Sequence, residues 1–325
     1  MKKIIPVLIF CSFLLNRLFS AVEIRKETSD FMDRFLQFSG YTQVNYAYLD
    51  AGINGFRIKR ARIKLTGEVL KNLFYKLQID TVNNPILLDA QVEFKFSPYA
   101  NLKFGQFKIP FSLENLVSSF GLDTINRSRI VEELCPGRDM GEKGRDIGFE
   151  IYGQLPKIEY SLGVFNGSGI NKTDYNQQKD IALRLVFKPL NSVHIALSNY
   201  NGRYISNHRS NHVNRNRTGV EMFFVGDYFS LKGEYILGKD KQARKCGWYI
   251  QASYYFLTEK LQAVVKCDSI DVDRDINGNH SEVITLGLNY FFSKDSKFQI
   301  NYEFHQEEPG KISNNVILIQ FQVGF

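Results

Sequence analysis

The sequence has few of the residue types and motifs on which metal sites, disulfide scaffolds and enzymes depend. It holds four cysteines, and Cys11 lies inside the first apolar run without the small-residue context of a lipoprotein signal. The other three, Cys135, Cys246 and Cys267, are far apart and lack metal-type spacing, so at most one disulfide can form. There is no P-loop, GxSxG or HExxH motif. We expect no catalytic residues, no enzyme activity and no cofactor.

Residues 273–284 match a calcium-binding loop only in part. The match covers ligand positions one, three and five and the glycine position, but position twelve is Ile284, where a bidentate glutamate is needed. An extracellular hairpin turning at Asn277 and Gly278 is the better interpretation. We predict no metal here.

His208 and His212 are four residues apart, but no acidic third ligand lies nearby. We predict a solvated basic loop over 202–215 instead of a metal site. Its arginines, among them Arg209, Arg215 and also the adjacent Arg217, would either attract anions at a channel mouth or bind lipopolysaccharide phosphates.

Long hydrophobic runs are absent beyond the N-terminus. Lys2 and Lys3 precede an apolar run from Ile4 to Leu15, which is the layout of a cleaved signal peptide with its cut near Ala21. No later stretch approaches 18 consecutive apolar residues, so no transmembrane helix is expected. We predict a signal peptide at 1–21, a short periplasmic arm at 22–33 and one domain at 34–325.

The excess of basic over acidic residues is also small. Removing Lys2, Lys3 and Arg17 from the 41 basic residues leaves 38 against 34 acidic residues, a formal net charge of +4. That excess is too small to indicate nucleic-acid binding in an exported protein. With 44% hydrophobic and 14% aromatic residues, the chain is either a soluble β-rich protein or a transmembrane β-barrel.

Alternation of apolar and polar residues runs through almost the whole chain after residue 36. It predicts sixteen strands, an even number that suits a bacterial outer-membrane barrel with both termini in the periplasm. We place them near residues 37–46, 56–66, 73–80, 86–95, 100–108, 144–154, 157–166, 179–188, 193–201, 216–226, 228–238, 246–256, 260–269, 281–292, 297–305 and 314–325.

The connections between these strands alternate in length. Short ones fall at 97–100, 154–157, 188–192, 226–227, 257–260 and 293–297, and longer ones at 109–143, 167–178, 202–215, 239–245, 270–280 and 306–313. Periplasmic turns alternate with extracellular loops in this way in outer-membrane barrels. The fold class we expect is therefore all-β, a transmembrane antiparallel barrel of sixteen strands.

The most informative strand is FRIKRARIKLT at 56–66. Alternation puts Arg60, Arg62 and Lys64 on one face and apolar residues on the other. A cation facing lipid near the midplane costs roughly 2–4 kcal/mol, so three on one strand would cost on the order of 6–12 kcal/mol by the same principle. The cationic face should therefore point into the lumen, where Asp80, Asp89 and Glu93 could pair with it.

Several segments together resemble the phosphate-selective porin O and P family. They are FRIKRARIKLTGEV at 56–69, DAQVEFKFSPYANLKFGQFKIPFSLE at 89–114, LGVFNGSG at 162–169, GWYIQASYYF at 247–256 and ITLGLNYFF at 284–292. The resemblance implies a sixteen-stranded outer-membrane barrel, usually a homotrimer, whose lumen is narrowed by infolded loops and passes phosphate or related anions along arginines and lysines.

The resemblance also suggests which residues form the anion pathway. The family's arginine-rich signature matches Lys59, Arg60 and Arg62, and the 109–143 connection takes the place of its constriction loop, with Arg127 and Arg129 in the segment NRSR. We predict an anion pathway that also includes Lys64, Lys76 and Lys108, with Lys95, Arg145 and Arg184 as weaker candidates. The acidic residues Glu114, Asp123, Glu132 and Glu133 in the same loop would weaken any anion preference.

We therefore expect an outer-membrane porin of a Gram-negative bacterium that passes small anions, phosphate or polyphosphate, and contacts outer-membrane lipid and lipopolysaccharide. The alternative is a non-selective or structural barrel whose extracellular loops bind a surface partner.

Overall fold

The structure is a computed structural model that describes residues 34–50, 52, 54–174, 176–205, 212–256, 260–307 and 314–325. The expected signal peptide, the arm at 22–33, His208 and Arg209 lie outside these residues. Among the described residues, no helix is both long enough and apolar enough to cross a membrane.

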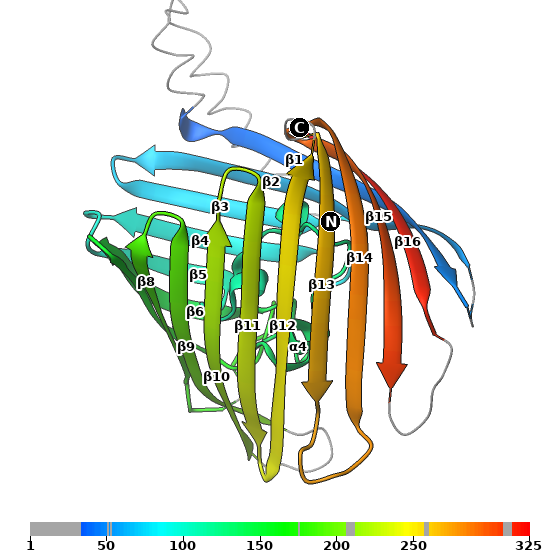
Figure 1. Cartoon of the computed structure of the whole chain (residues 1–325). Helices are drawn as coiled ribbons and strands as arrows, with labels where there is room; N and C mark the ends of the chain where they lie inside the picture. Colours follow the sequence, from blue (N-terminus) through cyan, green and yellow to red (C-terminus); the bar gives the residue numbers. More distant parts are fainter. Residues whose placement is uncertain are drawn as a thin grey trace, which may run out of the picture.

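The strands form one closed antiparallel barrel in which each strand pairs with its neighbours in sequence and β16 returns to β1 (Figure 1). This confirms the expected all-β barrel of sixteen strands. The strands are β1 (Gln37–Leu49), β2 (Gly55–Leu70), β3 (Leu73–Asp80), β4 (Leu87–Lys95), β5 (Asn101–Lys108), β6 (Arg145–Leu155), β7 (Ile158–Phe165), β8 (Asp180–Leu190), β9 (Val193–Ile205), β10 (His212–Val225), β11 (Phe229–Asp240), β12 (Ala243–Phe256), β13 (Leu261–Asp271), β14 (His280–Ser293), β15 (Ser296–Glu307) and β16 (Val316–Gly324).

The barrel closes at the two ends of its chain. β1 and β16 pair from Tyr41 opposite Gly324 to Leu49 opposite Val316. Beyond β16, Gly40 and Phe325 exchange two backbone hydrogen bonds of 3.0 Å, and the Phe325 ring stacks on Phe38 at 5.6 Å between centroids. Closure leaves no unpaired sheet edge, which is the condition for strands to lie in hydrocarbon.

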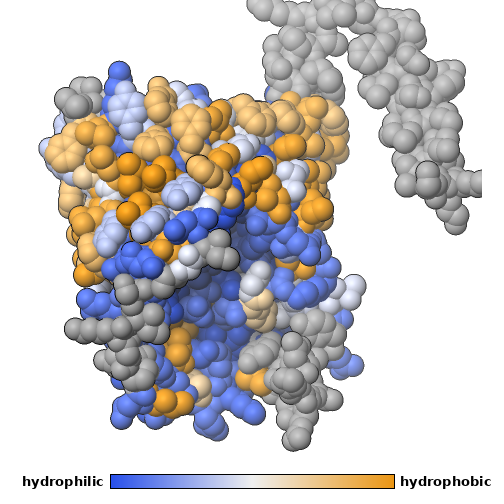
Figure 2. All heavy atoms as spheres, turned by 90° about the vertical axis from the view of Figure 1, so that its right-hand side faces the viewer, coloured by the Kyte–Doolittle hydropathy of each residue, from blue (hydrophilic) through white to orange (hydrophobic). Residues whose placement is uncertain are grey.

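The two faces of each strand differ as the alternation predicts. In β10, Arg217 and Glu221 point inward and are buried, whereas Val220 and Met222 point outward and are 49% and 46% exposed. On the face seen in Figure 2, apolar residues form a band around the end of the barrel that carries the C-terminus, and hydrophilic residues cover the other end. The outer wall is thus suited to lipid over part of its height.

Two of the long connections are shorter than predicted, because β9 to β12 run further than their hydropathy indicates. β9 continues to Ile205, β10 begins at His212, and only residues 241–242 join β11 to β12. In the segment VNRNR both faces are polar, since arginines point inward and asparagines outward. The hydropathy signal is lost there while backbone pairing continues.

A charge placed on the outer wall should weaken the barrel far more than the same charge inside it. Val92 lies outward in β4 and is 42% exposed, whereas Gln91 beside it lines a lumenal recess with Lys76 and Glu93. We expect Val92→Arg to lower the free energy of unfolding in lipid vesicles by about 2–4 kcal/mol. Gln91→Arg is the matched control and should cost much less. If urea titrations showed that Val92→Arg and Gln91→Arg lower the free energy of unfolding equally, this assignment of the two faces would be contradicted.

Candidate functional site

The long connection between β5 and β6, residues 109–144, folds into the barrel, and we call it the constriction loop. It contains two short helices, α3 (Leu113–Leu116) and α4 (Arg129–Leu134), and the 3-10 turn η1 (Ser119–Gly121). Its apolar side chains Ile130, Val131 and Leu134 are fully buried in one cluster with residues of β11 to β13. The loop therefore packs on one side of the barrel interior.

Asp123 fixes the middle of the constriction loop to that side. Its carboxylate accepts hydrogen bonds from Lys232 at 3.0 Å and Gln251 at 2.7 Å, and its carbonyl accepts from Asn289 at 2.8 Å and Gln299 at 3.0 Å. Burial opposes its charge, but Lys232 and then Lys297 outweigh burial and hold the pKa of Asp123 below its usual value. The Asp123 carboxylate is therefore occupied by hydrogen bonds that anchor the loop.

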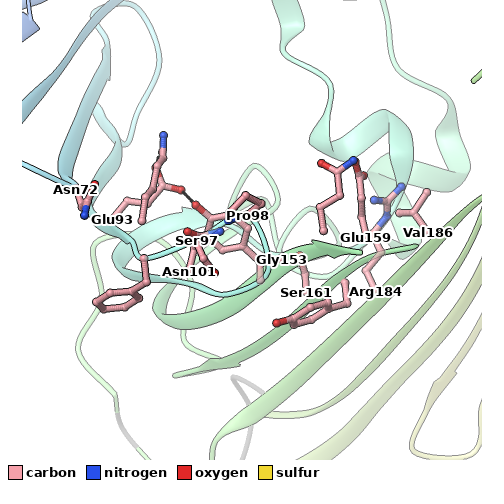
Figure 3. A pocket seen from close by; sticks show the side chains of 15 residues that line it. Asn72, Glu93, Ser97, Pro98, Asn101, Gly153, Glu159, Ser161, Arg184 and Val186 are labelled. Atoms are coloured by element: carbon pink, nitrogen blue, oxygen red, sulfur yellow. Dashed lines mark hydrogen bonds and ion pairs between the residues drawn. The ribbon is translucent and has the colours of Figure 1, made fainter. Parts of the chain in front are cut away.

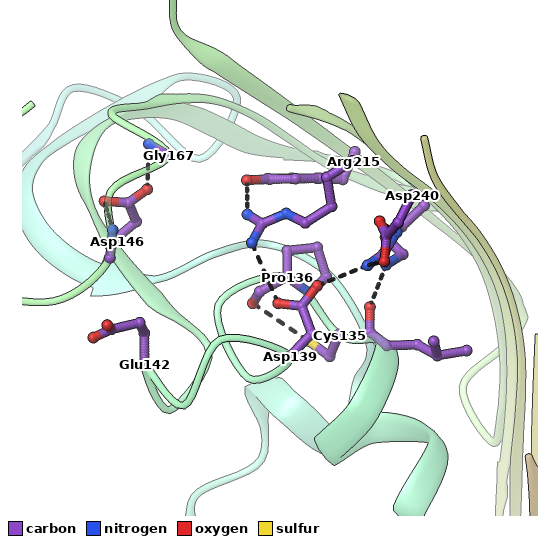
Figure 4. A network of polar contacts seen from close by, with 12 residues as sticks. Cys135, Pro136, Asp139, Glu142, Asp146, Gly167, Arg215 and Asp240 are labelled. Atoms are coloured by element: carbon purple, nitrogen blue, oxygen red, sulfur yellow. Dashed lines mark hydrogen bonds and ion pairs between the residues drawn. The ribbon is translucent and has the colours of Figure 1, made fainter. Parts of the chain in front are cut away.

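A second anchor holds the end of α4 through two buried arginines of β10 (Figure 4). Arg217 donates to Asp139 at 2.8 Å, to the Leu134 carbonyl at 2.9 Å and to Asp240 at 2.7 Å. Arg215 lies 3.4 Å from Asp139. The prediction that Arg215 and Arg217 belong to a solvated loop is wrong: they are 2% and 1% exposed and point into the barrel.

The two anchors leave the lumen asymmetric. The inward-facing side chains of Glu234, Lys266 and Asn301, on β11, β13 and β15, are at most 4% exposed, because the constriction loop packs on this side. On β2 and β3 the inward-facing Arg60 and Lys76 stay partly exposed, although Arg62 and Asp80 beside them are buried. Open space in the lumen therefore lies between the loop and the wall that includes β2.

A β-bulge in β2 brings more cations to this space than strict alternation allows. Gln43 of β1 pairs with Arg60, but the next residue, Val44, pairs with Ile58. Lys59 is left without a cross-strand partner, and its ammonium reaches the carbonyl of Ile125 in the loop at 2.8 Å. The register shift turns Ile58 outward, where it is 52% exposed.

The same bulge turns Arg57 inward, where its Nε donates to Asn45 at 3.0 Å. Sequence reasoning missed Arg57 because alternation counted back from Arg60 assigns it to the lipid side. The cost of a cation facing lipid was a signal that could have indicated the bulge.

Nine basic side chains and one carboxylate line a cavity of about 270 Å³ between β2 and the constriction loop. We call it the basic cavity. One water occupies about 30 Å³ of liquid, so the cavity has room for a small hydrated anion. The basic residues are Arg57, Lys59, Arg60, Arg62, Lys108, Arg127, Arg138, Lys143 and Arg145, and the carboxylate is Glu132.

Three of these cations are paired with carboxylates. Arg62 donates to Asp80 at 3.0 Å, Arg145 to Asp89 at 2.7 Å, and Arg138 to Glu132 at 2.9 Å. These pairs keep the guanidinium groups in place, and they also reduce the net positive charge that an entering anion meets.

The other six have no carboxylate partner among the described residues. Arg60 donates to the Gln43 amide at 2.8 Å, and Lys108 donates to three loop carbonyls, those of Asn115, Leu116 and Val117, at 2.6 to 3.1 Å. Neutral acceptors of this kind orient a cation without cancelling its charge.

Arg127 and Lys143 are the least satisfied members of the cavity. Nε and Nη1 of Arg127 and Nζ of Lys143 are buried and without a hydrogen-bond partner. Burial, followed by the neighbouring Arg138, lowers the pKa of Arg127, and burial likewise lowers that of Lys143. Neither side chain forms a salt bridge with a described residue, and a bound anion would supply the hydrogen-bond acceptors that these buried nitrogens lack.

The remaining predicted pathway residues lie outside this cavity. Lys64 lines a separate recess with Tyr41 and Gln78. Lys76 pairs with Asp89 at 2.9 Å. Arg129 lies against the opposite wall and pairs with Glu307 at 3.1 Å. Alternation alone could not separate them from the cavity cations, because that separation depends on where the constriction loop packs.

A larger recess of about 680 Å³ opens near the turn between β4 and β5 (Figure 3). Its charged lining is balanced, with Glu93 and Glu159 against Lys95 and Arg184. Arg184 is already paired with Glu221 at 2.5 Å. This recess therefore has no marked excess of either charge.

A closed barrel of sixteen strands, with an apolar outer wall and a loop that folds inside to leave a charged passage, is the architecture of an outer-membrane porin. Residues 38–325 match the model of the family described as phosphate-selective porin O and P. The chain belongs to that family, and its family and fold point to a channel.

Solved structures show the same fold at low sequence identity. An anion-selective porin from Comamonas acidovorans aligns with a TM-score of 0.70 and 12% identity over 89% of this chain and 99% of that one. OmpF of Salmonella typhi aligns with a TM-score of 0.67 and 10% identity over 89% and 97%. The trimer form of OmpT from Vibrio cholerae gives 0.63 and 9% over 89% and 99%. No curated relative matches by sequence.

Removing the charge of Asp139 should release the end of the constriction loop. Asp139→Asn leaves Arg215 and Arg217 buried with less compensation, and breaking a buried ion pair costs about 3–5 kcal/mol. Faster hydrogen exchange at the backbone amide of Cys135 should report the release. Glu132→Gln is the control, because the Glu132 side chain is 47% exposed and such pairs contribute about 0–1 kcal/mol. Unchanged exchange in Asp139→Asn would show that the pair does not anchor the loop.

Proposed function

We propose that this porin passes small anions by passive diffusion and selects them at the basic cavity. The observation that supports this most directly is the excess of six cations without carboxylate partners among the described residues, beside an open part of the lumen. Low-dielectric walls strengthen the field of such a cluster. An anion entering the cavity would be attracted, and a cation would be repelled.

The acidic residues of the constriction loop do not cancel this excess. Glu114 is fully buried and accepts a hydrogen bond from the Ser128 amide at 2.8 Å, and Asp123 is bound to Lys232 and Gln251 on the far wall. Both lie on the side of the loop that faces β11 to β15. The part of the loop that faces β2 contributes Lys143, Arg127 and Arg138 and a single carboxylate, Glu132, which is paired with Arg138 at 2.9 Å.

We infer that phosphate, or an anion that carries phosphate groups, is the preferred solute. A guanidinium matches two phosphate oxygens at once, and the unpaired nitrogens of Arg127 lie in the same cavity as Arg57 and Arg60. The family description names phosphate selectivity. Arg127, Arg60, Arg57 and Lys59 form the proposed binding set, with Lys143 as a further donor.

We also propose that the chain is exported by a cleaved signal peptide to the outer membrane of a Gram-negative bacterium and assembles as a homotrimer. The similarity to a trimeric OmpT structure supports the assembly, and the apolar band of the outer wall supports the membrane location.

Neutralising two cavity cations should reduce anion preference. In planar bilayers under a salt gradient, the wild-type reversal potential should indicate preference for chloride over potassium. Lys59→Gln combined with Arg60→Gln removes two charges, each contributing about 1 kcal/mol to the attraction of a nearby anion, so the permeability ratio should fall roughly thirtyfold. Phosphate should also compete less well with chloride.

The control is Lys95→Gln, which removes a lumenal charge from the balanced recess and should change the ratio little. A wild-type channel that prefers cations, or shows no preference, would overturn the anion proposal and favour a non-selective barrel. Chloride preference without competition by phosphate would overturn only the choice of phosphate.

A further inference from the structure

Residues 124–126 of the constriction loop connect the basic cavity to a strand that does not line it. Two strands, β16 and β1, lie between β15 and β2 in the closed barrel. On one side of the segment, Lys59 of β2 donates to the Ile125 carbonyl at 2.8 Å and to Oδ1 of Asn126 at 2.5 Å. On the other side, Nδ2 of Asn126 donates to Oε1 of Glu303 on β15 at 2.9 Å. One amide thus joins a cavity cation to a carboxylate outside the cavity.

The two partners allow the Asn126 amide only one orientation. An ammonium can only donate hydrogen bonds and therefore faces the amide oxygen, whereas an ionised carboxylate can only accept them and faces the amide nitrogen. Glu303 is 6% exposed, and its second oxygen lies 3.4 Å from Nε2 of His305. The Asn126 side chain is therefore held by Glu303 with its oxygen directed at Lys59.

The backbone of the same segment is fixed by other contacts. The amide of Ile125 donates to Oδ1 of Asn301 at 2.7 Å, and Lys266 donates to the Asn126 carbonyl at 3.0 Å. Neither hydrogen bond involves Glu303. Replacing that carboxylate should therefore leave the backbone in place and free only the side-chain amide of Asn126.

The fixed amide determines where the charge of Lys59 lies. The Ile125 carbonyl and the Asn126 oxygen accept two of its hydrogen bonds, and an ammonium has three donors, which leaves one for an anion in the basic cavity. The lysine stem is flexible, so a released ammonium would occupy many positions. A group that is already ordered loses less freedom when it binds a ligand, and it therefore binds more tightly.

We propose that Glu303 is a positioning residue for anion binding: through Asn126 it fixes the Lys59 ammonium in the geometry that binds phosphate. This inference rests on the proposed function of the basic cavity. Glu303 is not part of the cavity lining, and its negative charge by itself repels anions. A positioning role and a purely electrostatic role therefore predict opposite effects when Glu303 is replaced.

The test separates phosphate binding from anion preference in Glu303→Leu. In planar bilayers, inorganic phosphate should compete with the chloride current roughly fivefold less well than in the wild type, because the hydrogen bond that orients Asn126 is lost. The preference for chloride over potassium should stay the same or rise, because a negative charge has left the lumen. Glu303→Gln keeps an acceptor for Asn126, and phosphate should compete in it at least as well as in the wild type.

Glu307→Leu is the matched control. Glu307 lies on the same strand and pairs with the constriction loop through Arg129 at 3.1 Å, but Arg129 does not line the basic cavity. Phosphate should compete in this variant as it does in the wild type. Undiminished competition in Glu303→Leu, or a loss that Glu307→Leu shares, would overturn the positioning role.

Asn126→Leu breaks the same link at its middle. It should weaken phosphate competition as much as Glu303→Leu does, and combining the two substitutions should add little, because both remove one interaction. Fully additive losses would show that Glu303 acts by a route other than Asn126 and would overturn the proposal.

Acetylation of Lys59 tests the position of its ammonium without a bound anion. In the full-length porin in detergent micelles, mass spectrometry should show severalfold faster acetylation of Lys59 in Glu303→Leu, and an unchanged rate in Glu303→Gln and Glu307→Leu. If phosphate fails to compete in the wild type while acetylation responds in this way, the choice of phosphate is overturned and the positioning of Lys59 by Glu303 is supported. An unchanged rate in Glu303→Leu would overturn the positioning itself.

Discussion

The cost of placing charge in hydrocarbon is the constraint on which the rest of this structure depends. It requires the cations of β2 to face the lumen, and the strand meets this requirement by a bulge that turns Arg57, Lys59 and Arg60 inward together while Ile58 turns out. A regular strand would have left Arg57 and Lys59 on the lipid side, at a cost of roughly 2–4 kcal/mol each near the midplane. The bulge therefore raises the cation density of the lumen and keeps the wall apolar.

The constriction loop encloses the basic wall of β2 and so forms the basic cavity. Two of its carboxylates are used on the far side, where Asp123 binds Lys232 and Asp139 binds Arg217, and the one that lines the cavity, Glu132, is paired with Arg138. The loop thereby covers the mixed charges of β10 to β16 and leaves open the wall on which cations exceed carboxylates. Selectivity in our proposal arises from this arrangement and not from the net charge of the chain, which the sequence shows to be small.

The outer wall of the long strands β10 to β12 is consistent with the same cost. On β11 and β12 the outward apolar side chains Tyr235, Leu237 and Trp248 are followed, toward the strand ends that lie opposite the C-terminus (Figure 1), by the outward cations Lys239 and Arg244. The inward arginines of β10 anchor the loop. Hydropathy alternation fades in this region, which explains why the sequence predicted a solvated loop over 202–215.

The sequence by itself determined the class of fold, the number of strands and the inward orientation of Arg60, Arg62 and Lys64, because alternation and the cost of charge in lipid are local properties of each strand. Only the tertiary structure decided which cations act together. Arg127 joins β2 while Arg129 pairs on the opposite wall, and Arg62 is paired with Asp80 while Arg60 is not. These outcomes depend on the β-bulge and on the packing of the constriction loop, which bring together residues far apart in the chain.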